Sequence, residues 1–318
     1  MAHSEQTIPV LDLDDFRAGG EREARFVQAL GDAFVDTGFA ALVHHGVDLD
    51  LAREATAIAA AFFDLPEVVK LRYEDPKVLG QRGYTAFGRE HAKDQPVPDL
   101  KEFWHVGREL PAGHPLASAY APNLWPEEIP RFRAIMSALY AQLERCGDHL
   151  LEACALHLGE DRALFRAMAS DGDSVLRVLH YPPIPPDAHP ASIRAAAHED
   201  INLMTLLLES TAPGLELLQR DGAWRPIHAL AGQIIVDTGD MMQRLSNGYF
   251  KSTTHRVVNP ESSRERRFSM PFFIHPRHAV ALDPLASAIA RTGGRAAFAP
   301  IAAGAYLEQR LRAIGLGK

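Results

Sequence analysis

The second half of the chain alternates short apolar runs with turn residues. Beyond Asp171 the runs are about four to eight residues long, and signals such as Arg220–Asp221–Gly222 separate them. Many short strands divided by turns are typical of a sandwich or barrel of antiparallel sheets. The expected strands span residues 175–181, 203–208, 215–218, 224–227, 233–236, 252–258 and 268–275.

The first half shows the 3.6-residue period of amphipathic helices. A helix is expected over residues 21–37, between short strands at 8–13 and 38–43, and another begins after Asp48 or Asp50, either of which could cap it. The longest pattern covers residues 126–157, and we interpret its broad apolar stripe as core-facing. A segment rich in Ala, Leu and Arg over residues 286–316 is also expected to be helical.

Residues 74–122 lack a clear period and are rich in Gly, Pro and aromatic side chains. Long loops on a scaffold often carry substrate contacts, so the segment is a candidate lid over a site. The alternative, favoured to the same degree, is an irregular packed surface without substrate contacts. The segment contains Tyr84, Phe87 and Phe103, together with the cations Arg82, Arg89, Lys93 and Lys101.

Charge and cysteine content narrow the class of protein. The 318 residues carry 41 acidic and 33 basic side chains, a formal net charge of −8, with no long basic run, which argues against nucleic-acid or membrane-surface partners. Cys146 and Cys154 fall in one expected helix, about 12 Å apart by its rise, too far to pair. Free thiols, a polar start at residues 1–6 and no apolar run of about 20 residues predict a cytoplasmic protein.

The main chemical candidate is a metal site at the start of an apolar strand. His198 and Asp200 stand two positions apart, and on a strand such side chains leave the same face. His255, in a Thr- and Val-rich segment, is the best third ligand. Two imidazoles and one carboxylate form the facial triad that suits non-haem Fe(II). Taken alone, His198 and Asp200 could equally be a hydrogen-bonded pair at a strand end.

A second candidate is an anion site on the last expected strand. Arg267 and Ser269 alternate with apolar residues and therefore share one face. If that face lines a barrel interior, the guanidinium needs an anionic partner, and an arginine beside a hydroxyl suits a carboxylate. The alternative is an exposed basic cluster of Arg264, Arg266 and Arg267.

The remaining histidines and apolar candidates have more ordinary interpretations. The pairs His44–His45 and His275 with His278 are expected to be turn and surface features, because neither has a carboxylate at ligand spacing. Met204, Met242 and Phe273 could line a cavity, although core packing is the favoured role for each.

In order and spacing, these residues resemble the iron(II)/2-oxoglutarate-dependent dioxygenases, specifically their isopenicillin N synthase-like branch. His198-x-Asp200, His255 and Arg267-x-Ser269 carry the resemblance. Other segments similar to that branch extend over nearly the whole chain: residues 8–13, 38–46, 62–66, 101–103 and 246–257.

The resemblance implies a mixed α and β fold with a mainly β core, a double-stranded β-helix (jelly roll) flanked by helices. It implies an N-terminal dioxygenase region with helices and lid loops at 1–122, a long helical segment at 123–170, the catalytic core at 171–280 and a C-terminal helical segment at 281–318. These parts are expected to form one compact unit.

The resemblance also implies an oxidoreductase, a dioxygenase with Fe(II) held by His198, Asp200 and His255 and no catalytic side chain beyond the metal centre. 2-Oxoglutarate would chelate the iron, with its distal carboxylate on Arg267 and Ser269. Its oxidative decarboxylation, with O2, to succinate and carbon dioxide would drive hydroxylation, desaturation or cyclisation of a small organic molecule.

One position departs from the family pattern. Many members carry Asn-x-Tyr where this chain has Leu179–His180–Tyr181. Tyr181 matches the family tyrosine that can hydrogen-bond the oxo acid, whereas Leu179 stands where the asparagine amide would be. Alternatively, Tyr181 is a half-buried strand aromatic without this role. Two other functions stay open at this point: an iron oxidase of the isopenicillin N synthase type without 2-oxoglutarate, and a non-catalytic jelly-roll binding protein.

Overall fold

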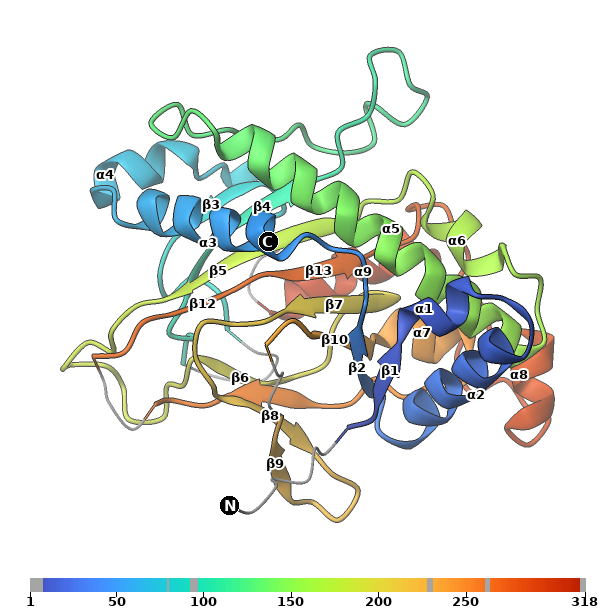
Figure 1. Cartoon of the computed structure of the whole chain (residues 1–318). Helices are drawn as coiled ribbons and strands as arrows, with labels where there is room; N and C mark the ends of the chain where they lie inside the picture. The colour runs from blue at the N-terminus through green and yellow to red at the C-terminus, as the bar shows by residue number, and fades with distance from the viewer. Residues whose placement is uncertain (1–7, 79, 92–96, 228–230, 261–263, 315–318) are drawn as a thin grey trace.

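The fold is seen in a computed structural model that describes residues 8–78, 80–91, 97–227, 231–260 and 264–314 (Figure 1). The polar start at residues 1–6, Lys93 of the candidate lid and residues 315–316 of the expected last helix lie outside the described residues.

A large sheet forms the middle layer of the molecule. Its strands follow the order β1-β2-β10-β7-β13-β5-β4-β3, and β12 pairs with β5 as well. All pairings are antiparallel except β1 with β2. The strands are β1 (Val10–Asp12), β2 (Phe39–Val43), β3 (Gly83–Thr85), β4 (Glu102–Gly107), β5 (Val175–Tyr181), β7 (Met204–Leu208), β10 (Ile234–Thr238), β12 (Arg267–Ser269) and β13 (Pro271–Ile274).

A smaller antiparallel sheet faces the inner side of the large one. Its order is β6 (Ala195–His198), β11 (His255–Val257), β8 (Leu215–Leu218) and β9 (Trp224–Pro226). A buried apolar cluster with residues from both sheets, including Phe39, Leu179 and Leu217, fills the space between them. Two facing antiparallel sheets with a shared interior form the expected jelly roll.

Helices cover the outer side of the large sheet. In Figure 1, α3 and α5 lie on the side opposite to β6 and β8. The buried stripe of α5 packs on β4, β7 and β13, as its apolar pattern predicts. The helices are α1 (Leu13–Arg17), α2 (Gly20–Asp36), α3 (Leu49–Phe63), α4 (Glu67–Lys70), α5 (Phe132–Leu158), α6 (Leu164–Ala169), α7 (Asp240–Leu245), α8 (Ala286–Arg291) and α9 (Ala303–Ala313), with 3-10 turns at Leu71–Tyr73 and Pro76–Val78.

Aromatic side chains join these helices to the sheet. The ring of Trp104 on β4 lies with its centroid 4.8 Å from that of Phe62 on α3 and 5.2 Å from that of Phe132 on α5. Both pairs have the edge-on geometry that aromatic quadrupoles favour. Cys146 and Cys154 are free thiols in the buried stripe of α5, in agreement with the expectation that they cannot pair.

Several expected elements differ from the structure. The segment over 286–316 is not one helix, because Gly293 and Gly294 adopt positive φ angles of 94° and 78° and end α8. The long helix begins at Phe132 and not near residue 126. The last strand is divided at Met270 into β12 and β13, which pair with different parts of β5.

Asp48 is the residue that caps α3, which the sequence alone left undecided between Asp48 and Asp50. Its Oδ1 accepts hydrogen bonds from the backbone N–H of Asp50 (2.8 Å) and of Leu51 (3.3 Å). We expect Asp48→Ala to lower the free energy of unfolding by about 1 kcal/mol, because two N–H groups lose their acceptor. Asp50→Ala is the control, and chemical denaturation should show a loss below about 0.5 kcal/mol. Equal losses would contradict the assignment of the cap.

Candidate metal centre

His198, Asp200 and His255 meet at the open end of the small sheet. His198 is the last residue of β6, His255 is the first of β11, and the antiparallel register places them opposite each other. Their ring centroids are 4.4 Å apart. The Nε2 atoms of both rings lie 3.7 Å from Asp200 Oδ1. Strand pairing therefore brings together two residues 57 positions apart in the numbering of the chain.

Hydrogen bonds fix the orientation of both imidazoles. His198 Nδ1 donates to the carbonyl oxygen of Ala196 (2.7 Å), and His255 Nδ1 donates to that of Thr253 (3.1 Å). A carbonyl oxygen only accepts, so the ring protons are on Nδ1 and the Nε2 lone pairs face Asp200. Metal-binding histidines are commonly oriented in this way.

Asp200 lies beyond the end of β6, just before a bend at residues 201–203, and not on the strand as the sequence argument assumed. It converges with His198 because the bend is anchored, and not because of strand alternation. The backbone N–H of Asp240 donates to the Asp200 carbonyl (2.9 Å), and Thr205 Oγ1 donates to Asp200 Oδ2. Gly239 leaves room for this bend, since a Cβ there would lie 2.1 Å from Asn202 Oδ1.

The donor set fits a metal ion. The three ligand atoms lie within 4.8 Å of one another, close enough to converge on one ion. Burial, together with the neighbouring charge of His255, lowers the pKa of His198 to about 4, although Asp200 opposes the shift. The neutral imidazole that a metal requires is thus the favoured form near pH 7. Two histidines and one carboxylate suit non-haem Fe(II).

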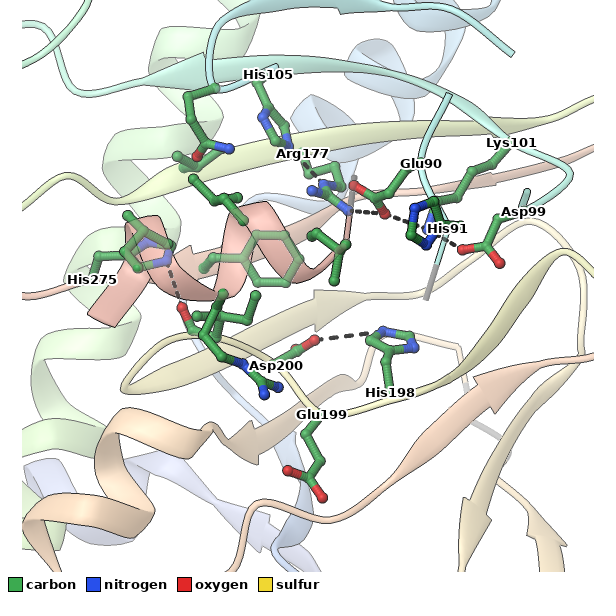
Figure 2. Close-up of a pocket in the computed structure, with 18 residues that line it drawn as sticks. Glu90, His91, Asp99, Lys101, His105, Arg177, His198, Glu199, Asp200 and His275 are labelled. Carbon is green, nitrogen blue, oxygen red and sulfur yellow. Dashed lines mark hydrogen bonds and ion pairs between the residues drawn. The ribbon is translucent and has the colours of Figure 1, made fainter. Parts of the chain in front are cut away.

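The centre lies between two compartments of one cavity. We call the first the inner compartment; it extends between the sheets, and its lining includes Tyr181, Asp237, His255, Arg267 and Ser269. We call the second the outer compartment; its lining includes Glu90, Asp99, His275, Leu307 and Leu311 (Figure 2). Both compartments share five residues: Lys101, Arg177, His198, Asp200 and Phe273.

The inner compartment holds a buried guanidinium. Arg267 is 1% exposed, and its Nε donates to the carbonyl oxygen of Ala212 (2.9 Å). Its Nη1 has no hydrogen-bond partner among the described residues. The guanidinium carbon lies 5.1 Å from the ring centroid of Tyr181, and the buried Ser269 lines the same space. A buried cation without a carboxylate partner is costly, so this geometry calls for an anionic ligand.

The exposed-cluster interpretation is wrong for Arg267, although Arg264 and Arg266 are exposed. Asp237 does not neutralise the cation, because burial and the charge of Asp200 raise its pKa well above the usual range and favour its protonated form. A second buried arginine, Arg194, contacts the same Tyr181 ring, 5.9 Å from its centroid.

The candidate lid contributes to the outer compartment. Figure 2 shows Glu90, His91, Asp99 and Lys101 gathered across the cavity from His198. Other residues of this segment have different roles: Arg82 is buried against Asp173, with Nη2 2.6 Å from Oδ1.

Several lining residues were not selected from the sequence as site residues, among them Glu90, Arg177 and His275. His275 is buried, donates from Nε2 to the carbonyl oxygen of Ile201 (2.8 Å) and lines the cavity, so its interpretation as a surface residue was wrong. Arg177 could have been found, because Arg177, Leu179 and Tyr181 alternate along β5 and therefore share its inner face.

A second group of possible ligands lies at the surface. Asp12, Asp14 and His44 have ligand atoms within 4.8 Å of one another. Asp14 and His44 are exposed, and Asp12 Oδ1 caps α1 by accepting the N–H of Asp14 (2.9 Å). Capping and solvation account for this group.

A jelly roll with two histidines and one carboxylate converging inside a cavity is typical of the non-haem iron oxygenases. Comparison of the sequence with family models agrees. Residues 8–128 match the family described as non-haem dioxygenase in morphine synthesis N-terminal, and residues 172–276 match the 2OG-Fe(II) oxygenase superfamily.

Individual relatives support the same family. A 2-oxoglutarate-Fe(II) type oxidoreductase of Aspergillus fumigatus is 31% identical over 277 residues, 84% of this chain and 82% of the relative. The crystal structure of a 2OG-Fe(II) oxygenase family protein from Caulobacter crescentus is similar with a TM-score of 0.86 and 42% identity, covering 97% of this chain and all of that one. Neurospora crassa T7H in complex with alpha-KG gives a TM-score of 0.84 at 30% identity, with 98% of both chains covered.

The chain therefore belongs to the 2OG-Fe(II) oxygenase superfamily, and the N-terminal match is consistent with the isopenicillin N synthase-like branch. It is an oxidoreductase that uses Fe(II), 2-oxoglutarate and O2 and couples decarboxylation of the oxo acid to oxidation of a C–H bond. The alternatives of an oxidase without 2-oxoglutarate and a non-catalytic protein are not favoured. Among the described residues, no helix combines the length and apolarity that a membrane crossing requires.

We expect Thr205→Val to weaken Fe(II) binding about tenfold or more, because Asp200 Oδ2 loses its hydroxyl donor while the shape of the side chain is nearly retained. Anaerobic competition with a chelator measures this affinity. Thr85→Val is the matched control, since Thr85 is buried on β3 and lines neither compartment. An unchanged affinity in Thr205→Val would show that the hydroxyl does not orient the carboxylate.

Proposed function

We propose that His198, Asp200 and His255 hold the Fe(II) of this oxygenase and that Arg267, Ser269 and Tyr181 bind its 2-oxoglutarate. The observation that carries the proposal is the position of the buried Arg267 guanidinium, which lines the same inner compartment as the three convergent ligands. One compartment then offers a metal site for the oxo-acid end and a cation for the distal carboxylate.

The two ends of 2-oxoglutarate require different groups. The Arg267 guanidinium is planar and can hold a carboxylate through two parallel hydrogen bonds, and Ser269 adds a hydroxyl. Tyr181, whose ring centroid lies 5.1 Å from the guanidinium carbon, limits its movement. Leu179 lines the compartment where many relatives carry an amide, so we propose an apolar contact with the co-substrate at this position.

The bound iron would supply the redox chemistry: O2 is the oxidant, and its reduction is shared between 2-oxoglutarate, which is oxidised to succinate and carbon dioxide, and the C–H bond of the substrate. The residues of this chain orient the ligands and keep the site enclosed. The ring of Phe39 lies edge-on to that of His255, with centroids 5.7 Å apart, and shields it on one side. Exclusion of water protects a reactive oxidant from side reactions.

We propose a small organic molecule as the primary substrate, bound in the outer compartment, and no nucleic-acid or membrane partner. T7H of Neurospora crassa, a structural relative at 29% identity, has been crystallised with alpha-KG and thymine, which supports a ligand of this size. The buried free thiols Cys146 and Cys154 support the cytoplasm as the compartment.

We expect Arg267→Leu to raise the 2-oxoglutarate concentration needed for half-maximal binding by about tenfold or more, since a charge-assisted contact is lost. The visible charge-transfer band of an iron-bound oxo acid, titrated without oxygen, measures this requirement. Arg266→Leu is the control, because this neighbouring side chain is exposed and pairs with Asp64, 2.8 Å away. A similar requirement in both variants would show that Arg267 does not bind the co-substrate.

We expect His255→Ala to abolish the same band, because a ligand of the iron is removed. His44→Ala should leave it intact, since His44 belongs to the surface group with Asp12 and Asp14. Loss of the band only in the His44 variant would move the iron site to that group. Near-native far-UV circular dichroism of both variants would exclude unfolding as the cause.

A further inference from the structure

The outer compartment contains a buried network of four charged side chains. Lys101 Nζ lies 2.8 Å from Asp99 Oδ2 and 2.6 Å from Glu90 Oε1. Arg177 Nη1 lies 3.1 Å from the same Glu90 oxygen. Two carboxylates and two cations make the network neutral as a whole. Figure 2 shows it facing His198 across the cavity.

One carboxylate oxygen of the network has no hydrogen-bond partner within it. Glu90 is 6% exposed, and its second oxygen, Oε2, has no hydrogen-bond partner among the described residues. Burial alone would raise the pKa of Glu90, but the charges of Arg177 and Lys101 overcome this and hold the pKa well below its usual range. Glu90 Oε2 is therefore an ionised acceptor in the wall of the compartment.

Arg177 supplies a donor beside this acceptor. Its Nε donates to His105 Nε2 (2.6 Å) and its Nη1 to Glu90 Oε1, while the described residues show no hydrogen bond from Nη2. The guanidinium carbon lies 4.4 Å from the ring centroid of Phe103 and 5.3 Å from that of Phe273, so the group is held between two rings. A fixed donor next to a fixed acceptor favours one ligand geometry.

The charge balance restricts the kind of ligand. A substrate carboxylate beside Glu90 would meet a like charge, and a substrate cation would add to Arg177 and Lys101. Arg310, which also lines the compartment, is already paired with Asp240 (Nε to Oδ2, 3.2 Å), so either ligand would leave a buried charge uncompensated, which is costly. An uncharged group with an N–H donor and an adjacent C=O acceptor, as in an amide, satisfies both Glu90 and Arg177.

The rest of the compartment is apolar in part. Leu307, Leu311 and Ile314 of the α9 region and Ile201 line it, and Phe273 lines both compartments. A compact hydrocarbon portion fits this wall, and a flat group fits against the ring.

We propose that the primary substrate is a small, uncharged cyclic amide, imide or ureide whose N–H donates to Glu90 Oε2 and whose C=O accepts from Arg177. This assignment depends on the proposed function, since it places the substrate next to the iron held by His198, Asp200 and His255. Glu90 and Arg177 select the substrate by its amide edge, and Phe273 with Leu307 and Leu311 contacts its apolar part.

A matched pair of ligands tests the proposal on the unmodified protein. Full-length protein is loaded with Fe(II) and 2-oxoglutarate without oxygen, and glutarimide, N-methylglutarimide and cyclohexanecarboxylate are titrated while the charge-transfer band is followed. We expect glutarimide to perturb the band and to bind at least about tenfold more tightly than the other two. A site built around a hydrogen bond to N–H rejects the analogue that lacks it.

A variant locates the selectivity at Glu90. We expect Glu90→Gln to reduce the preference for glutarimide over its N-methyl form to below about threefold, because the ionised acceptor is lost. Glu74→Gln is the control from the same segment; its carboxylate lies 3.6 Å from Arg89 and lines neither compartment. Full preference retained in Glu90→Gln would overturn the proposal. The comparison of glutarimide with N-methylglutarimide on the unmodified protein tests the proposal without relying on this variant.

Equal binding of the two imides, tighter binding of the carboxylate, or no response to glutarimide when the band is present would each overturn the substrate class. In all three cases the proposed function would stand, because the band itself reports iron and 2-oxoglutarate. Absence of the band in the unmodified protein would instead overturn the assignment of the iron and 2-oxoglutarate site, and the substrate proposal with it.

Discussion

The antiparallel pairing of β6 with β11 is the contact on which the candidate site depends. It places His198 and His255 opposite each other at the end of the small sheet, and the anchored bend after β6 adds Asp200. A shift of one residue in this register would turn one histidine to the other face, since side chains alternate along a strand. The shared interior of the two sheets, which holds the register, is therefore also what keeps the three ligand atoms together.

Electrostatics divides the cavity into two parts with different ligand preferences. The inner compartment contains Arg267, whose Nη1 has no hydrogen-bond partner among the described residues, and burial together with the charge of Asp200 raises the pKa of Asp237, so the guanidinium favours an anionic ligand. The outer compartment contains the balanced network of Glu90, Asp99, Lys101 and Arg177, which favours an uncharged ligand. With the ligands proposed above, the acidic co-substrate and the neutral substrate would be distinguished by their charge, because buried charges tolerate only complementary partners.

Sequence patterns failed where the backbone changes direction. Two glycines with positive φ end α8 and divide the expected C-terminal helix. Met270 separates β12 from β13, and Asp200 converges with His198 from beyond the end of β6 and not along a strand. In each case the pattern of apolar and polar residues continues through a point where the helix or strand ends. The pattern alone cannot reveal such an interruption of the backbone.

The sequence by itself determined most strands and helices, the mixed fold with its jelly-roll core and the family, because periodicity and ordered motifs are local properties. It also named the three candidate ligands and Arg267, whose roles stay predictions while their convergence is observed. Only the tertiary structure decided that Arg267 is buried, that His275 lines the cavity and that Glu90 meets Arg177, 87 positions away. Such contacts depend on strand register and loop path, which arise from the packing of the whole chain and not from the neighbourhood of either residue.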